Sequence, residues 1–93
     1  MNFYFYVLYS LKDNKLYKGY SANIGQRLIK HNAGATASTK HRRPLVLIYT
    51  EIFATKSEAI KREIWAKSKE GGPEIVKLLI ERNILNHSHK LNI

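Results

Sequence analysis

The stretch Tyr4-Phe-Tyr-Val-Leu-Tyr-Ser10, followed by Lys15-Leu-Tyr-Lys-Gly-Tyr-Ser21, decides the fold. Both runs are rich in aromatic and β-branched residues, which favour strands. The segment between them, Leu11-Lys-Asp-Asn14, contains Asp and Asn, which tolerate the left-handed backbone of a tight turn. We therefore predict a β-hairpin. The first run is apolar or aromatic on both faces, which places it at the centre of its sheet.

The composition predicts one small domain. The chain has 93 residues, of which 44% are hydrophobic and none is cysteine. This length leaves room for one modest core, and the lack of cysteine excludes a disulfide scaffold, a thiolate metal site and a cysteine nucleophile. The apolar opening run covers only about seven residues, too few for a signal peptide core or a membrane span. We expect a cytoplasmic protein with no membrane partner.

The charge is concentrated in the first half of the chain. The net charge is +9, and residues 12–43 hold eight Lys or Arg against one acid, Asp13. From Pro44 onward, eight basic residues face six acidic ones. An excess of this kind attracts polyanions, so the first half predicts nucleic-acid binding. The alternative is a basic surface that only keeps a small protein soluble.

The segment Ser21–Asn32 predicts the first helix. Asn23 is placed to cap its start, with Gln26 in the capping-box position, and Gly34 is placed to end it. The segment that follows, 33–43, is small and polar and ends in basic residues. This is the composition of a mobile loop that could lie along a phosphate backbone.

Two polar residues of this helix are placed where they can reach the sheet. On a helical wheel, Ile24 and Leu28 form the buried stripe, and Arg27 and His31 lie together along one edge of it. Both polar side chains can therefore reach inward.

The second half predicts one strand and two helices. The strand is Leu45–Phe53, after Pro44, and the capping box Thr55-Lys-Ser-Glu58 starts a helix that runs to Lys69. Gly71-Gly-Pro73 ends this helix, and Pro73 starts the last helix, which runs to Arg82. The order β-β-α-β-α-α predicts an α+β fold, a small three-stranded antiparallel sheet flanked by helices. We expect one domain over 1–82 and a loosely held tail over 83–93.

Glu63 is unusual because it falls inside the apolar arc of its helix. A buried carboxylate is costly unless a cation, a metal or strong donors lie beside it. The structural alternative is an ion pair with Lys67, one turn further along the same helix.

These residues together resemble the GIY-YIG nuclease superfamily, and most closely its small single-domain bacterial members. Tyr4-Phe5-Tyr6 stands where the family has its first motif, and Tyr17-Lys18-Gly19 where it has Tyr-Ile-Gly. Arg27 falls eight residues past Gly19, at the position of the family's catalytic arginine. His31 and Glu63 match the family's helix histidine and its metal-holding glutamate. The asparagine that some larger members use near their C-terminus has no clear counterpart here.

The resemblance implies phosphodiester hydrolysis and a role for each matched residue. Glu63 would hold one Mg²⁺ or Mn²⁺, mostly hydrated, beside the departing 3′ oxygen. Arg27 would stabilise the charge that develops on the phosphate. Tyr6 or Tyr17 would take a proton from water or orient it, and His31 is a second candidate for proton handling. The residues predicted to contact nucleic acid are Lys18, Gly19, Lys30, Lys40, Arg42 and Arg43.

The geometry of the hairpin leaves the pairing of the two tyrosines open. If the turn has only two residues, at Asp13 and Asn14, then Tyr17 opposes Ser10 and lies roughly 13 Å from Tyr6. The two phenols could then not reach one water without a longer loop or a bulge. Both tyrosines are also residues that a half-buried strand uses for packing.

The sequence thus predicts a metal-dependent endonuclease acting on DNA, or alternatively on RNA, in repair or recombination. The competing hypothesis is a non-catalytic nucleic-acid-binding module that uses the basic surface of residues 12–43. No small-molecule cofactor is expected, because the chain has no glycine loop that would cradle a nucleotide. The pair His87 and His89 lacks a third ligand at useful spacing for a metal site.

Overall fold

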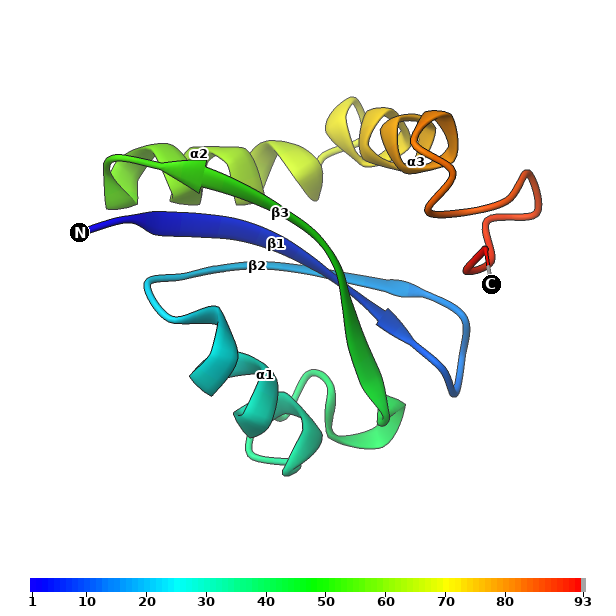
Figure 1. Ribbon diagram of the computed structural model, residues 1–93, viewed down its shortest axis with the longest axis horizontal. Helices are drawn as coiled ribbons and strands as arrows, with labels where there is room; N and C mark the ends of the chain where they lie inside the picture. The colour runs from blue at the N-terminus through cyan, green and yellow to red at the C-terminus, as the bar shows by residue number, and fades with distance from the viewer. Residues whose placement is uncertain (93) are drawn as a thin grey trace.

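The structure, a computed structural model, describes residues 1–92. It is an α+β fold with a three-stranded antiparallel sheet in the order β2-β1-β3, which confirms the predicted class and the central place of the first strand (Figure 1). The elements, in chain order, are β1 (Phe3–Ser10), β2 (Leu16–Ser21), α1 (Ile24–Asn32), the short 3₁₀ helix η1 (Lys40–Arg42), β3 (Leu45–Phe53), α2 (Lys56–Ala66) and α3 (Gly71–Glu81).

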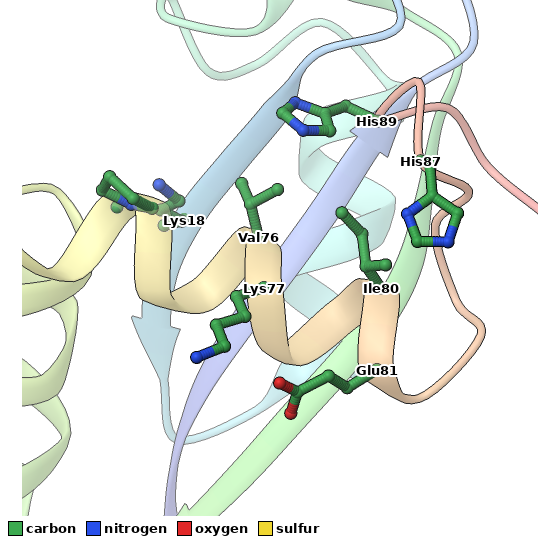
Figure 2. Close-up of a pocket in the computed structure, with 9 residues that line it drawn as sticks. Lys18, Val76, Lys77, Ile80, Glu81, His87 and His89 are labelled. Atoms are coloured by element: carbon green, nitrogen blue, oxygen red, sulfur yellow. The ribbon is translucent and has the colours of Figure 1, made fainter.

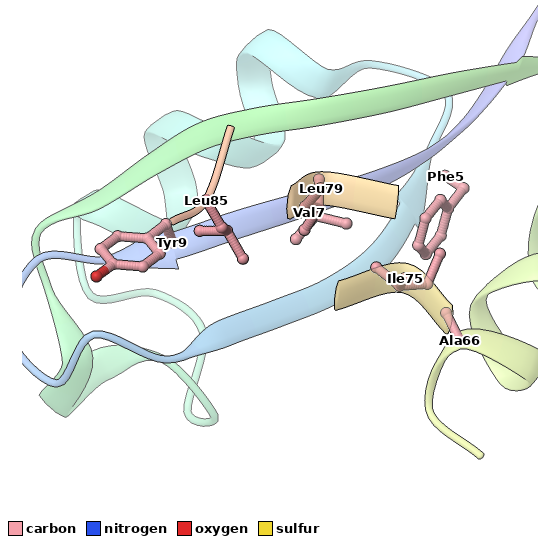
Figure 3. Close-up of a cluster of buried hydrophobic side chains, with 7 residues drawn as sticks. All are labelled: Phe5, Val7, Tyr9, Ala66, Ile75, Leu79 and Leu85. Carbon is pink, nitrogen blue, oxygen red and sulfur yellow. The ribbon is translucent and has the colours of Figure 1, made fainter. Parts of the chain in front are cut away.

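The helices cover opposite faces of the sheet. In Figure 1, α2 and α3 lie above the sheet and α1 lies below it. The upper face carries the main core, in which side chains from β1, the end of α2, α3 and the following segment pack together (Figure 3). These buried residues are Phe5, Val7, Tyr9, Ala66, Ile75, Leu79 and Leu85. The lower face holds a smaller cluster of Tyr6, Leu8 and Leu45, against which α1 packs through Ile24 and Leu28.

The predicted hairpin is present, with a loop longer than two residues. The backbone nitrogen of Ser10 donates to the carbonyl of Lys15, and Asn14 within the loop has a φ of +59°. Asn tolerates this left-handed backbone, as the sequence predicted. The longer loop shifts the register, so that Tyr17 pairs with Leu8 and Gly19 pairs with Tyr6.

Two predicted helix starts are confirmed by their caps. The side chain of Asn23 accepts a hydrogen bond from the backbone nitrogen of Gln26 at 3.1 Å. Thr55 and Glu58 form the predicted capping box at the start of α2. These bonds satisfy backbone N–H groups that the first turn of a helix leaves without partners.

The prediction for the region between α2 and α3 is wrong in one respect. Helix α3 begins at Gly71, so Gly71 and Gly72 belong to the helix and do not break the chain before it. A Cβ on Gly71 would lie only 1.9 Å from the carbonyl oxygen of Trp65. Glycine is therefore needed here because the two helices approach closely, not because the backbone must turn.

Residues 83–92, which the sequence places in a loosely held tail, contact the rest of the fold. The side chain of Leu85 is 1% exposed and lies in the main core. Leu85 also forms an isolated β-bridge with Leu91, and the backbone nitrogen of Asn92 donates to the carbonyl of Ile84. We therefore propose that the folding unit extends past residue 82.

The segment 33–43, which the sequence predicts to be a mobile loop, is held against the rest of the fold by two of its side chains. Thr39 is buried, and Arg42 forms an ion pair with Asp13 of the hairpin loop at 2.7 Å.

Over residues 1–92, no helix combines the length and the apolar character that crossing a membrane requires.

Candidate active site

Tyr6 and Tyr17 lie on the same face of the sheet and close to each other. Tyr6 pairs with Gly19 and Tyr17 pairs with Leu8, so the two tyrosines are diagonal neighbours on adjacent strands. Their ring centroids are 6.4 Å apart. The separation of roughly 13 Å expected for a two-residue turn is therefore wrong, because the longer loop slides β2 along β1.

Gly19 makes room for the phenol of Tyr6. A Cβ at position 19 would lie 2.5 Å from the hydroxyl oxygen of Tyr6 and 2.6 Å from the ring carbon that carries it. The ring of Tyr6 therefore crosses β2 at the one residue that has no side chain. Gly19 is buried, and the phenol of Tyr6 lies against it.

His31 reaches the tyrosines from α1 and is almost completely buried. Its Nε2 lies 3.0 Å from the hydroxyl oxygen of Tyr6, and its Nδ1 lies 2.7 Å from the hydroxyl oxygen of Thr39. The His31 ring also contacts the ring of Tyr17 edge-on, with centroids 4.9 Å apart. Burial lowers the pKa of His31 below its usual value, and the charge of Arg27 lowers it further. His31 is therefore neutral at pH 7.

The hydrogen bonds around His31 favour one tautomer. The hydroxyl of Thr39 can donate to the carbonyl of Thr36, at 3.5 Å, which leaves its oxygen free to accept from Nδ1–H of His31. The Nε2 lone pair then accepts a hydrogen bond from the hydroxyl of Tyr6. The chain of donors runs from Tyr6 through His31 to Thr39.

The charges of Arg27 and Glu63, on different helices, both affect the pKa of Tyr6. Burial raises the pKa of Tyr6 above the usual phenol value, and the neighbouring Tyr17 adds to the rise. The charge of Arg27, on α1, lowers this pKa, and the charge of Glu63, on α2, raises it. Both charges therefore lie within electrostatic reach of one phenol, although their helices cover opposite faces of the sheet.

Glu63 also has the ion pair that the structural alternative predicts. Its Oε2 lies 3.5 Å from Nζ of Lys67, and its side chain is 18% exposed. The same ammonium group lies 5.6 Å from the centre of the Tyr17 ring. Lys67 thus links the carboxylate to the tyrosine pair.

Comparison with known proteins identifies the family of this chain. The family model described as the GIY-YIG catalytic domain matches residues 2–72. The chain belongs to the GIY-YIG family. It is 50% identical over 66 residues to the UPF0213 protein SH2523 of Staphylococcus haemolyticus, covering 70% of this chain and 79% of that protein. It is 52% identical over 66 residues to the UPF0213 protein SSP2268 of Staphylococcus saprophyticus, with the same coverage.

A solved structure has the same fold. The solution NMR structure of the UPF0213 protein BH0048 from Bacillus halodurans superposes with a TM-score of 0.51 and shares 34% sequence identity, covering 84% of this chain and 85% of that one. GIY-YIG is a family of endonuclease type. Its members act on nucleic acid and generally depend on a divalent metal.

Among the described residues around Tyr6, Glu63 is the side chain suited to hold a divalent ion. Within residues 1–92, no group of three or more His, Asp or Glu side chains converges in a way that would enclose a metal. Glu63 offers one partly exposed carboxylate whose partner, Lys67, is itself 49% exposed. A hydrated Mg²⁺ or Mn²⁺, which takes one or two carboxylates and keeps several waters, fits this donor set.

The predicted nucleic-acid contacts do not all lie on the GIY-YIG site face. Lys18 points to the opposite face, where its Nζ donates to the carbonyl of Ala66 at 2.9 Å. Arg42 is held by Asp13 and by the carbonyl of Leu16. Lys30 is exposed beside Arg27 on α1. Lys40 and Arg43 are exposed and line a separate hollow of about 460 Å³ together with Lys12, His41, Asn32 and Pro44.

An apolar hollow lies away from the residues around Tyr6. Its volume is about 640 Å³, and it follows one side of α3 between Lys18 and the histidines of the C-terminal segment (Figure 2). Val76 and Ile80 form much of its floor, and His87 and His89 face it. Of the residues predicted for chemistry or nucleic-acid contact, only Lys18 lines it.

Sequence reasoning missed two residues of this site. Thr39 lies in a segment whose composition predicts a loop, yet it is buried and hydrogen-bonded to His31. Lys67 was considered only as an ion-pair partner, yet it lies over the Tyr17 ring. No local pattern marks Thr39. For Lys67, the helical spacing of four residues from Glu63 was the available signal.

Proposed function

We propose that this chain is a divalent-metal-dependent endonuclease that hydrolyses phosphodiester bonds in DNA. The observation that carries the proposal is the convergence at one phenol: Tyr6 is hydrogen-bonded to His31, is next to Tyr17, and is reached by the charges of Arg27 and Glu63. Structural packing alone does not require an arginine and a carboxylate beside a buried tyrosine.

The proton of the attacking water has a path through Tyr6. Because burial raises the pKa of Tyr6, this residue is a neutral phenol at pH 7 and not a ready base. Its hydroxyl donates to the neutral Nε2 of His31 and keeps oxygen lone pairs to accept a proton. As water attacks phosphorus, its proton passes to the oxygen of Tyr6 while the phenol proton passes to Nε2 of His31. Tyr17, beside both rings, orients the same water.

Arg27 and Glu63 supply the charges that the transition state needs. Arg27 is exposed on the site side of α1, and its planar guanidinium matches two phosphate oxygens. Glu63 would hold Mg²⁺ or Mn²⁺, and the bound ion would neutralise the charge that develops on the departing 3′ oxygen. The exposed bases Lys30, Lys40 and Arg43 attract the rest of the nucleic acid.

The proposal includes a cytoplasmic location and a role in DNA repair or recombination, where a small nuclease meets its substrate. RNA is an alternative substrate. The second candidate function is a nucleic-acid-binding module without catalysis. The pairing of Glu63 with Lys67 favours it, because a carboxylate engaged by an ammonium group is less available to a metal.

The test is cleavage of branched, single-stranded and duplex DNA with Mg²⁺ or Mn²⁺, comparing the wild type with Arg27→Ala and Glu63→Gln. We expect each variant to lose about 100-fold or more of the cleavage rate, because each removes a group that stabilises transition-state charge. Binding of DNA should be retained. Arg82→Ala and Glu70→Gln change exposed residues outside the site and are the matched controls.

Two results would contradict the nuclease proposal. One is equal residual cutting by the wild type and both variants, which would identify a contaminating enzyme. The other is salt-sensitive DNA binding by the wild type without cutting in either metal, which would support the binding module.

A further inference from the structure

The sheet face that carries Tyr6 continues beyond it in a second row of side chains. Along β1, Tyr4 lies two residues before Tyr6, and it pairs with Ser21 of β2 and Ile52 of β3. Paired residues of neighbouring antiparallel strands point to the same face, as do residues two apart on one strand. Tyr4 and Ile52 therefore lie side by side on the Tyr6 face.

This end of the face is not covered by a helix. Ile52 is 60% exposed, and Thr50, which pairs with Tyr6, is exposed as well. Helix α1 packs near the other end of the same face, where it contacts the cluster that includes Leu8. The row of Tyr4 and Ile52 is thus a floor made of a partly buried aromatic ring and an exposed aliphatic side chain.

Cationic groups line a hollow that begins at the residue paired with Tyr4. Ser21, the β2 partner of Tyr4, also lines a hollow of about 220 Å³ that is bounded by Arg27 and Lys30. A ligand that fits both features has an anionic group for the two cations and a flat apolar part for the floor. A nucleotide has this combination, because its phosphate binds basic side chains and its base has a π-face that stacks on aromatic rings.

The base must be unpaired to use such a floor. In a duplex, the faces of the bases are covered by their neighbours in the stack, and only their edges are accessible. Proteins that contact base faces act on single strands, loops or nucleotides displaced from the stack. Two residues along β1 span about 6.8 Å, so a base on Tyr4 would lie beside a linkage held at Tyr6.

We propose that Tyr4 and Ile52 form a platform that binds the face of an unpaired nucleobase next to the linkage held at Tyr6 and Arg27. The inference rests on the proposed nuclease function and gives it a substrate class, namely nucleic acid with an unpaired nucleotide at the cleavage position. Single-stranded or branched substrates meet this requirement, and continuous duplex does not.

The experiment measures binding and needs no cleavage. A series of short single-stranded DNA oligonucleotides, each with the fluorescent base 2-aminopurine at a different position, is titrated with protein in EDTA. We expect quenching at one position for the wild type, and about tenfold weaker binding for Tyr4→Ala and for Ile52→Thr. Tyr4→Phe keeps the ring and should bind as the wild type does. Ile64→Thr changes an isoleucine that is 63% exposed on α2 and is the matched control.

An abasic nucleotide at the quenched position completes the test. If the platform binds that base, the abasic oligonucleotide should bind the wild type about tenfold more weakly, and Tyr4→Ala should have no further effect on it. Equal loss for abasic and intact oligonucleotides in Tyr4→Ala would overturn the proposal, and so would equal loss in Ile64→Thr. Blunt duplex that competes as well as single-stranded DNA would also overturn it.

The remaining outcomes separate this inference from other occupants and from the nuclease proposal. A dimer that Ile52→Thr dissociates in sedimentation, with quenching unchanged, would assign the floor to a second copy of the chain and reject the platform. If quenching depends on Tyr4 but the protein shows no metal-dependent cleavage, the result would support the platform and contradict the nuclease proposal.

Discussion

Gly19 and Tyr6 show how the absence of one side chain organises this site. The structure explains why position 19 of the family motif is a glycine: the phenol of Tyr6 lies where a Cβ would be. The phenol can then hydrogen-bond His31, and the charge of Glu63 raises its pKa. At the scale of single residues, the lack of a side chain at Gly19 lets the Tyr6 hydroxyl group take its position beside His31.

Replacing Gly19 should damage both the fold and the site. In Gly19→Ala the new Cβ would lie 2.5 Å from the Tyr6 hydroxyl oxygen, so the ring must move. We expect a loss of about 1–3 kcal/mol in the free energy of unfolding, measured by urea denaturation, and at least tenfold lower cleavage. Gly25→Ala is the control: its Cβ would meet no atom closer than 3.6 Å, and in a helix it should be neutral or stabilising. Equal effects of both substitutions would refute this packing role.

The burial of His31 should make stability depend on pH. Since its folded pKa lies below the unfolded value of about 6.5, the unfolded chain binds more protons. The stabilising contribution is therefore present above about pH 6.5 and is lost as the pH falls below it. Urea denaturation at pH 7.5 and pH 5 should show this loss in the wild type and a smaller one in His31→Gln. The exposed His41→Gln is the control, and a pH dependence unchanged in His31→Gln would contradict the assignment.

At the scale of elements, α2 carries both the expected metal ligand and its competitor. Glu63 and Lys67 lie one turn apart, so their side chains meet on one side of the helix. A divalent ion bound by Glu63 would therefore compete with the ammonium group of Lys67 for the negative charge of the carboxylate.

Removing the competitor should strengthen metal binding. In Lys67→Met, the apolar length of the side chain is largely kept and the ammonium group is lost. Because exposed ion pairs contribute about 0.2–1 kcal/mol, Mn²⁺ should bind up to about fivefold more tightly, as measured by calorimetry without substrate. Lys61→Met, at an exposed position of the same helix, should leave the affinity unchanged. Weaker Mn²⁺ binding in Lys67→Met would mean that Lys67 does not compete for Glu63.

The elements themselves were largely predictable from sequence, and the exceptions have physical causes. Caps at Asn23 and Thr55 and the strand Leu45–Phe53 depend on local residues, so they appear where local patterns place them. The role of Gly71 was not predicted, because a glycine is needed there for the close approach of Trp65. A local sequence pattern does not show which helices approach each other. The hairpin loop was underestimated in length, which moved Tyr17 relative to Tyr6.

At the scale of the whole molecule, the site joins elements that cover opposite faces of the sheet. The residue types of the site could be proposed from the sequence through their order and spacing. The proximity of these residues could not be predicted, because it depends on Tyr6 crossing β2 at Gly19 and on α2 packing against β1 and β2. Thr39 was unpredictable for the same reason: its burial follows from the return of a long loop under His31.

The C-terminal segment should be part of the cooperative fold, although its composition predicts a tail. Leu85 is 1% exposed and packs with residues of β1 and α3 in the main core. Leu85→Ala should therefore lower the free energy of unfolding by about 2–5 kcal/mol in urea denaturation, since it leaves a cavity as well as less buried apolar surface. Leu11→Ala, at a residue that is 48% exposed, should change it by less than about 0.5 kcal/mol. A wild-type midpoint for Leu85→Ala would show that the segment lies against the core without stabilising it, and the domain would then end near residue 82.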